Sequence, residues 1–454
     1  ERPTIKGFPE LRWTGKRPYR STQYYPAQLR ERYGDERDGW INKIFWGDNL
    51  QVMSHLLKEY RGKIDLVYID PPFDSKADYK RKIALKGIGN TTSDATSFEE
   101  KQYGDIWTND EYLQFMYERL MILRELMSDT ASIFVHCDWH KVHHLRCLMD
   151  EIFGSNMFLN EIVWQRTRAA HSDATYFGKV HDTILVYKKG GQAKFNPLYT
   201  EHSEAYLKRF TKEENGRKYM LVPLHGPGQG VARNFFGKII APPAGRCWPV
   251  QSKIDELIAQ NRVELTSNGT PSKKSYLDEN NGNPVSDWWD DIVPLNPVAS
   301  ERTDYPTQKP EQLLERIVEA ATNRGDLVFD CFMGSGTTQS VAMKLGRRFI
   351  GADINLGAIQ TTTKRLINVA SELDGQLQEE IKYTGFEVYN VNNYDFFRNP
   401  IEAKNLIIEA LEVQPFAQGN VWDGELDGRM VKIMPVNRIA TKADLEELKA
   451  NLPY

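Results

Sequence analysis

Cysteine is scarce in this chain, with four residues among 454. No two of them form a C-x-x-C pair, so the sequence indicates neither a disulfide scaffold nor a cysteine zinc site. Long apolar runs are also missing, because no stretch approaches the roughly 18 residues of a membrane-spanning helix. The first residues, Glu1 to Thr4, lead into polar and aromatic sequence and show no secretory signal. We therefore expect a soluble protein of a reducing cytoplasm, with no membrane association.

The chain has no overall excess of positive charge. Its formal net charge is −4 at pH 7, although a protein that binds nucleic-acid phosphates needs clustered lysine and arginine. The basic residues are unevenly distributed, however, and residues 161–250 carry about twice as many Lys and Arg as Asp and Glu. This stretch is therefore the part of the chain best suited to face a nucleic-acid backbone.

Metal ligands are suggested only weakly, by the histidines His136, His140, His143 and His144. Residues 140 and 144 lie one helical turn apart, which is a spacing seen in metal sites. No carboxylate or cysteine completes a recognisable ligand set, and the apolar residues that follow indicate a half-buried helix. We predict no metal site.

The most informative motif is Asp70-Pro71-Pro72-Phe73, which follows the apolar run 64–69. The two prolines fix the backbone and donate no N–H, so carbonyl acceptors are left pointing outward beside the Asp70 carboxylate. Phe73 adds an aromatic face for stacking. These features together suit a flat molecule with hydrogen-bond donors, such as a nucleobase. The plainer alternative is a strand that ends in an ordinary proline-rich turn.

A second motif begins with a short predicted strand at 326–330. Gly334 and Gly336 follow it in a turn that lets a ligand approach the backbone before a helix opens. Asp353 ends the next predicted strand, where an acidic residue can bind the two hydroxyls of a ribose. About 20 residues separate Gly334 from Asp353, as in dinucleotide-binding proteins, so an NAD-dependent enzyme is an open alternative. The turn lacks the third glycine of that motif, because Gln339 takes its place.

Together the two motifs resemble those of S-adenosylmethionine-dependent amino-methyltransferases of DNA. The tetrapeptide precedes the glycine turn, an order similar to the circularly permuted beta class, which includes modification subunits of type III restriction-modification systems. Segments 45–50, 180–187 and 305–314 also resemble motifs of this family. The resemblance covers about residues 40–190 and 300–395.

The resemblance implies a catalytic site and a cofactor site. Asp70, Pro71, Pro72 and Phe73 would hold the target base. Asp48 is expected at the adenine of the cofactor, which would be S-adenosyl-L-methionine. The full set of implied cofactor-binding residues is Asp48, Asp330, Phe332, Gly334, Gly336, Thr337, Thr338, Asp353 and Lys309.

The expected fold class is α/β, a Rossmann-like methyltransferase fold. It would have a mostly parallel sheet with helices on both faces, circularly permuted, with an inserted target-recognition region. We expect five parts: an N-terminal arm at 1–40, a catalytic half at 41–190, the target-recognition insertion at 191–300, a cofactor-binding half at 301–395 and a C-terminal appendage at 396–454.

The mechanism implied by these residues concerns an exocyclic amine. Such an amine is a poor nucleophile because its lone pair is delocalised into the ring. Acceptors on its two N–H bonds, here the Asp70 carboxylate and the Pro71 carbonyl, would favour a tetrahedral nitrogen and expose the lone pair to the sulfonium methyl. A base inside a duplex cannot reach such a pocket, so we expect it to be flipped out of double-stranded DNA and stacked on Phe73. No metal is needed.

Several functions compete at this stage. The first is a DNA adenine-N6 methyltransferase, and its nearest rival is a cytosine-N4 enzyme, because the same acceptors suit either amine. In the family, Asp at the first motif position leans to adenine and Ser to cytosine. An NAD-dependent oxidoreductase would need a hydride-positioning site that we cannot find. A non-catalytic DNA-binding subunit would not need an intact Asp70.

Partners follow from the charge distribution and from the resemblance. The polar loop 75–105 leaves the sheet beside the tetrapeptide, so we expect a lid or a DNA-contacting loop there. A second copy of the chain and a restriction nuclease subunit are further partners that the resemblance suggests. The basic residues expected to bind DNA are Arg166, Arg168, Lys188, Lys189 and Arg233.

Overall fold

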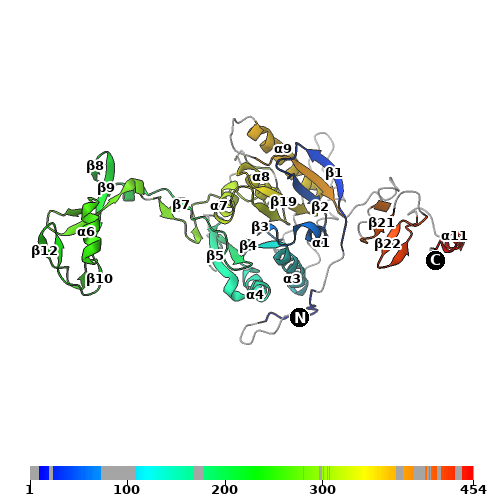
Figure 1. The fold of residues 1–454 in the computed structure, drawn as a ribbon, viewed down its shortest axis with the longest axis horizontal. Coiled ribbons are helices and arrows are strands. Elements are labelled where there is room, and N and C mark those ends of the chain that lie inside the picture. Colours follow the sequence, from blue (N-terminus) through cyan, green and yellow to red (C-terminus); the bar gives the residue numbers. More distant parts are fainter. Residues whose placement is uncertain are drawn as a thin grey trace. The chain divides into compact units, whose positions relative to one another are not determined.

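The computed structural model divides the chain into two compact units. Unit 1 comprises residues 1–196 and 287–454, and unit 2 comprises residues 197–286. Figure 1 shows the elements of both units. The structure describes residues 10–19, 24–72, 109–167, 177–279, 281–295, 299, 301–303, 305, 307–374, 382–391, 404–405, 408, 411–416, 421–434 and 442–452.

Unit 1 is built on a sheet with the strand order β1-β20-β2-β19-β18-β3-β4-β6-β5-β17. The strands from β20 to β4 run parallel to one another. Beyond them β1, β6 and β5 join by antiparallel pairing, and β17 pairs parallel with β5. The strands are β1 (Gln28–Tyr33), β2 (Asn42–Trp46), β3 (Ile64–Ile69), β4 (Met127–Cys137), β5 (Phe158–Gln165), β6 (His181–Lys188), β17 (Trp288–Trp289), β18 (Leu327–Asp330), β19 (Arg348–Asp353) and β20 (Phe386–Asn390).

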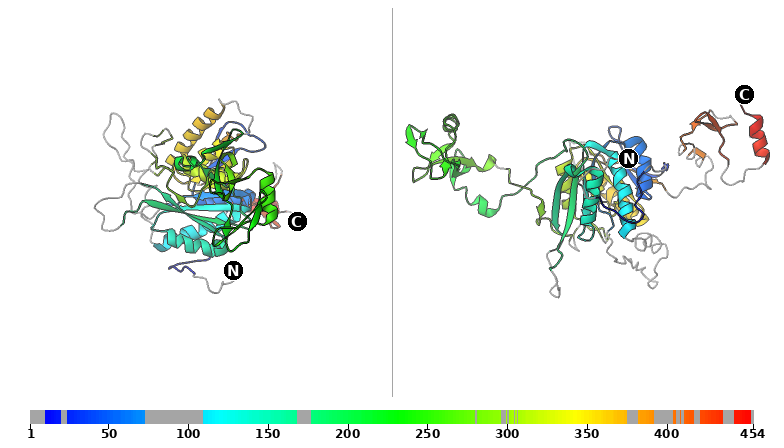
Figure 2. Two further views of the ribbon diagram at one scale, coloured as in Figure 1. Left: turned by 90° about the vertical axis from the view of Figure 1, so that its left-hand side faces the viewer. Right: turned by 90° about the horizontal axis from the view of Figure 1, so that it is seen from below.

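Helices cover both faces of this sheet (Figures 1 and 2). Helices α1, α3 and α4 pack side by side on one face, and α7, α8 and α9 pack side by side on the other. The expected fold class, a mostly parallel sheet between two helical layers, is confirmed; that its strand order arose by circular permutation stays a prediction. The helices are α1 (Asn49–Tyr60), α3 (Asn109–Leu126), α4 (Val142–Phe153), α7 (Glu311–Ala321), α8 (Thr337–Lys344) and α9 (Leu356–Asp374).

The central strands are apolar on both faces because helices cover both. Every residue of β3 except Asp65 is buried, and all four residues of β18 are buried. Such continuous apolar runs are typical of parallel strands. In α7 the buried residues recur every three or four positions, which places them on one face of the helix. They are Leu313, Leu314, Ile317, Val318 and Ala321.

The direction of the chain changes between β18 and β3, which are neighbours in the sheet. From β18 the chain passes through α8 to β19 on one side, and from β3 it passes through α3 to β4 on the other. Because the two connecting helices lie on opposite faces, the carboxyl ends of β18 and β3 form the topological switch point of the sheet. Open α/β sheets bind their ligands at such a position.

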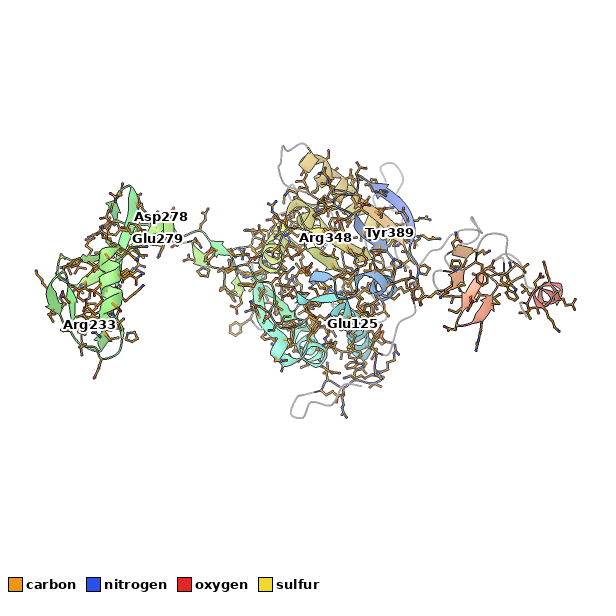
Figure 3. The ribbon with its side chains drawn as sticks, in the orientation of Figure 1. Glu125, Arg233, Asp278, Glu279, Arg348 and Tyr389 are labelled. Carbon is orange, nitrogen blue, oxygen red and sulfur yellow. The ribbon has the colours of Figure 1, made fainter. Side chains whose placement is uncertain are left out.

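Unit 2 contains a small antiparallel sheet with the order β14-β15-β9-β8, a hairpin and a helix. Its apolar core includes Phe235 and Trp248. Arg217 forms ion pairs with Asp278 and Glu279. Figure 3 labels both acidic residues. The elements are β7 (Tyr199–Thr200), α5 (Glu204–Leu207), β8 (Lys212–Glu214), β9 (Arg217–Pro223), β10 (Gly226–Pro227), β11 (Arg233–Phe235), β12 (Lys238–Ile240), β13 (Arg246–Cys247), α6 (Gln251–Ala259), β14 (Val263–Leu265), β15 (Pro271–Tyr276) and β16 (Asn283–Pro284).

The C-terminal residues form a short sheet and a helix. These elements are β21 (Gln414–Pro415), β22 (Gly424–Leu426), β23 (Arg429–Val431) and α11 (Lys442–Ala450). The expected loop 75–105 lies outside the described residues. Among the residues that are described, no helix combines the length and apolar character needed to cross a bilayer.

Candidate active site

Four aspartates gather at the carboxyl ends of neighbouring strands. Asp330 and Asp353 are the last residues of β18 and β19, Asp70 directly follows β3, and Asp48 lies two residues after β2. The four strands are adjacent in the order β2-β19-β18-β3, with about 5 Å between neighbours. Residues that are far apart in the sequence therefore share one edge of the sheet, at the topological switch point.

The turn after β18 requires glycine at two positions. Gly334 has a φ of 55° and Gly336 a φ of 72°, in the left-handed region. A Cβ on Gly336 would lie 2.5 Å from Cγ2 of Thr362, so a larger residue does not fit. The turn leads into α8, which therefore begins at this edge of the sheet. Such a helix start favours negatively charged or polar groups of a ligand.

Asp330 builds this turn. Its Oδ1 accepts a hydrogen bond from the backbone N–H of Phe332 at 3.0 Å, and its Oδ2 accepts one from the Thr338 hydroxyl at 2.6 Å. Burial raises the pKa of the Asp330 carboxyl to about 7, although these hydrogen bonds oppose the rise. Thr337 precedes Thr338 in the chain, and the Thr337 hydroxyl accepts a hydrogen bond from the Arg365 guanidinium at 3.0 Å. That Asp330, Phe332, Thr337 and Thr338 contact a cofactor stays a prediction.

Asp353 links the turn to the neighbouring strand end. Its Oδ2 accepts a hydrogen bond from the backbone N–H of Gly334 at 2.8 Å, and its Oδ1 accepts one from the N–H of Asn355 at 2.8 Å. Burial raises the pKa of this carboxyl to about 6. A carboxylate has about four lone-pair sites, so the Asp353 carboxylate keeps capacity for a further donor such as a ribose hydroxyl.

Asp48 has a structural role that the sequence did not reveal. Its Oδ1 caps α1 by accepting from the N–H groups of Leu50 and Gln51, at 2.9 and 3.3 Å. Its Oδ2 forms an ion pair with the buried Arg119 at 2.9 Å. Both oxygens are thus engaged by the protein, and the expected contact of Asp48 with the adenine of a cofactor stays a prediction.

Asp70 and Lys309 meet directly, a contact between residues to which the sequence analysis gave separate roles. The Lys309 ammonium donates to Oδ2 of Asp70. Oδ1 of Asp70 is a buried atom, and the described residues offer it no hydrogen-bond donor. One oxygen is therefore charge-paired, while the other has unused acceptor capacity at the switch point. Pro71 is buried and Pro72 half-buried behind it, and Phe73 lies outside the described residues.

Three buried polar side chains, Tyr68, His136 and Asp182, form a chain of contacts that begins on the strand before Asp70 and ends at the half-exposed Arg166. The Tyr68 hydroxyl lies 2.9 Å from Nδ1 of His136, and Nε2 of His136 lies 3.4 Å from Oδ2 of Asp182. Arg166 completes the chain, with its Nε 3.2 Å from Oδ1 of Asp182. Burial raises the pKa of Asp182, but the His136 hydrogen bond and the neighbouring positive charges bring it below its usual value. The sequence singled out His136 only as a candidate metal ligand.

The residues expected to bind DNA fall in different places. Arg166 follows β5 at the same sheet edge as Asp70, and half of its side chain is exposed. Lys188 and Lys189 lie at the other end of β6, which runs antiparallel to β4, so the structure does not bring them to this site. Lys189 donates to the carbonyl of Met127 at 2.5 Å. Their role in DNA binding stays a prediction, which this placement does not favour.

Two further basic residues were expected at a DNA interface. Arg233 belongs to unit 2, where Figure 3 labels it, and Arg168 lies outside the described residues. Histidine, cysteine and acidic side chains in the described part of the chain form no group of three or more that is arranged to hold a metal ion. The four cysteines are free thiols.

Known proteins similar to this chain are DNA methylases. A DNA methylase family model matches residues 64–364. The chain is 30% identical to the type II methyltransferase M.EcaI of Enterobacter cloacae, over 82% of each protein. It is 29% identical to the type III restriction-modification enzyme StyLTI Mod subunit of Salmonella typhimurium, over 67% of this chain and 50% of that protein.

Solved structures align more loosely. The M1.HpyAVI–SAM complex aligns with a TM-score of 0.36 and 17% identity, over 71% of this chain and 98% of that one. Against the type III Mod subunits of Salmonella typhimurium and Haemophilus influenzae, the chain spans about half of their length.

Proposed function

Because this chain belongs to the N6/N4 family of DNA methylases, we propose that it methylates the exocyclic N6 amine of adenine in double-stranded DNA. The methyl donor would be S-adenosyl-L-methionine. One observation carries the choice of site: Oδ1 of Asp70 is buried at the topological switch point, and the described part of the chain offers it no donor. An amine N–H would supply the missing hydrogen bond.

The neighbouring strand ends suit the cofactor. The glycine turn and the start of α8 allow close approach of a ligand to the backbone, and Asp353 keeps acceptor capacity for a ribose hydroxyl. Lys309 stands between this side and Asp70. We infer that the carboxylate at the methionine end of the cofactor binds the Lys309 ammonium, which places the methyl group beside Asp70.

The reaction would be a direct displacement. The Asp70 carboxylate and the Pro71 carbonyl each accept a hydrogen bond from one N–H group of the amine. The lone pair of the nitrogen then points toward the methyl group. The nitrogen forms a bond to the methyl carbon as the carbon–sulfur bond breaks, and the electron pair of that bond stays on sulfur. The product amine then loses a proton to solvent. The target base must leave the duplex to reach this position.

Cytosine-N4 methylation is the second candidate, because the family covers both amines and the same two acceptors bind either. Asp at the first position of the tetrapeptide favours adenine by the resemblance described above. A homodimer and a nuclease partner stay predictions.

The product decides between the two amines. Purified protein and S-adenosylmethionine are incubated with genomic DNA from a host that lacks DNA methyltransferases, and the digested nucleosides are analysed by mass spectrometry. We expect N6-methyladenine from the wild type and from Glu125→Gln, a charge change at the opposite end of the sheet, and none from Asp70→Ala. N4-methylcytosine would overturn the choice of base, and an active Asp70→Ala variant would overturn the site.

A further inference from the structure

Trp139 is a large aromatic residue left exposed in the turn between β4 and α4. Its relative exposure is 42%. The turn is held by Asp138, whose Oδ1 accepts from the His140 N–H at 3.0 Å and whose Oδ2 lies 2.5 Å from Nδ1 of His140. The His140 ring lies 3.5 Å from the Trp139 ring, centre to centre. These contacts fix the ring in place although it is not buried. A role in core packing does not explain a tryptophan held at the surface in this way.

The turn lies at the edge of the sheet that carries Asp70. Ile69 of β3 pairs with Val135 of β4, so Asp70 stands beside His136. Trp139 follows His136 by three residues, in the turn that begins after Cys137. With strands about 5 Å apart and at most about 10 Å spanned by three residues, the backbones of Asp70 and Trp139 lie within roughly 15 Å of each other. Successive nucleotides of one DNA strand are about 3.4 Å apart along the helix axis, so the ring lies within reach of the bases near the target.

Basic side chains lie at this edge of the sheet, and one of them contacts the ring. The Lys179 ammonium lies 3.0 Å from the centre of the Trp139 ring, in a cation–π contact. Arg166 follows β5 at the same edge, with half of its side chain exposed. The acidic neighbours are engaged, because Asp138 is bonded to His140 and the buried Asp182 to His136 and Arg166. An exposed ring among cations is the combination with which proteins bind unstacked nucleic acid.

We propose that Trp139 stacks on the base that loses its neighbour when the target base leaves the duplex, and that Lys179 binds a phosphate next to it. This inference rests on the proposed function. In the free protein the ammonium of Lys179 lies over the ring. In the complex, the phosphate attracts the Lys179 ammonium away from the ring, and the base then stacks on the ring face that the ammonium covered. Trp139 thereby offsets the stacking lost on extrusion.

The chain offers a matched control at the other end of the same sheet. Phe195 is also an exposed aromatic residue, with a relative exposure of 71%, next to a lysine in the sequence. That lysine, Lys194, contacts Asp65 at the start of β3 and Asp326 just before β18. Phe195 therefore tests the loss of an exposed ring away from the candidate active site.

The test compares paired and mispaired targets. The sites methylated in the genomic DNA of the experiment above supply the target sequence. Single-turnover methylation is measured on a duplex of that sequence and on the same duplex with a mismatch at the target base. We expect Trp139→Ala to slow methylation of the paired duplex by about tenfold to a hundredfold and of the mismatched duplex by much less, because a mispaired base is already partly unstacked. Trp139→Phe and Phe195→Ala should stay near the wild type.

Two results would overturn the proposal: equal slowing on both duplexes, or a Trp139→Ala variant as fast as Phe195→Ala. DNA binding, followed by anisotropy, separates this proposal from the proposed function. If the wild type methylates neither adenine nor cytosine, the proposed function fails. Weaker binding by Trp139→Ala than by Phe195→Ala would then still support the contact with DNA, and equal binding would refute it.

Discussion

At the scale of single residues, the ion pair between Lys309 and Asp70 joins the two halves of the proposed reaction. The ammonium engages one oxygen of the carboxylate on which the amine would depend. A cofactor carboxylate that attracts Lys309 would therefore also change the hydrogen bonding of Asp70. If Lys309 binds the cofactor as proposed, binding of the cofactor and activation of the amine would be coupled through this one side chain.

Replacement of Lys309 tests this coupling. Lys309→Met should weaken binding of S-adenosylmethionine by about tenfold to a hundredfold, since a charge-assisted hydrogen bond contributes about 1.5 to 3 kcal/mol. Asp70→Ala should leave the affinity within a few fold of the wild type or tighten it, because Lys309 is then released from Asp70. Both are measured by titration calorimetry. Unchanged affinity in Lys309→Met would mean that the lysine serves Asp70 alone.

Asp330 gives a pH-dependent prediction. Burial raises the pKa of this carboxyl to about 7, from an ordinary value of 3.8. Between these values the folded state holds a proton that the unfolded state lacks, so the contribution of Asp330 to stability is present at low pH and is lost as the pH rises toward and through 7. Asp330→Asn lacks this titration. Thermal unfolding should show the wild type losing stability relative to the variant from pH 5 to 8, and parallel curves would contradict this.

At the scale of elements, the turn between β18 and α8 is constrained by both its backbone and its neighbours. Gly336 and Gly62 have nearly the same φ, 72° and 70°. A Cβ on Gly62 would meet nothing within 4 Å, whereas one on Gly336 would lie 2.5 Å from Thr362. The two glycines therefore separate the strain of the backbone from the steric demand of the packed turn.

Alanine at both glycines measures this difference. Gly62→Ala should lower the free energy of unfolding by about 1 to 2 kcal/mol, which is the left-handed strain alone. Gly336→Ala should cost clearly more, because Thr362 and α9 must also move, and it should weaken cofactor binding. Urea unfolding and calorimetry provide the two measurements. Equal destabilisation by both variants would show that the turn relaxes freely.

The sequence predicted these elements where local pattern decides the structure. The apolar runs before Asp70, Asp330 and Asp353 had to be buried strands, and the glycines between them had to form a turn. The pairing of Lys309 with Asp70 was not predictable, because it joins side chains more than two hundred residues apart. The position of Lys188 was not predictable either. The apolar pattern of a strand does not show whether the strand runs parallel or antiparallel to its neighbour, and β6 runs antiparallel to β4, which places Lys188 at the end of the sheet away from the site.

At the scale of the whole molecule, the question is which edge of the sheet the DNA meets. The net charge of −4 gives no overall attraction to phosphate, so binding depends on where the cations lie. Arg166 lies at the edge with Asp70, and Lys188 at the opposite edge, where it donates to the carbonyl of Gly191. Each residue carries one positive charge, and they lie at opposite edges of the same sheet. Neutralising one and then the other therefore compares the two edges as sites for DNA.

Neutralising each of these residues in turn locates the DNA. A phosphate contact contributes about 0.9 to the slope of log affinity against log salt concentration, so Arg166→Gln should reduce the slope by about one unit. Lys188→Gln should leave the slope unchanged, against the expectation from the sequence. Both slopes are obtained by fluorescence anisotropy of a labelled duplex in a series of KCl concentrations. A reduced slope in Lys188→Gln would mean that the duplex also reaches the second edge, and an unchanged slope in Arg166→Gln would remove this arginine from the DNA interface.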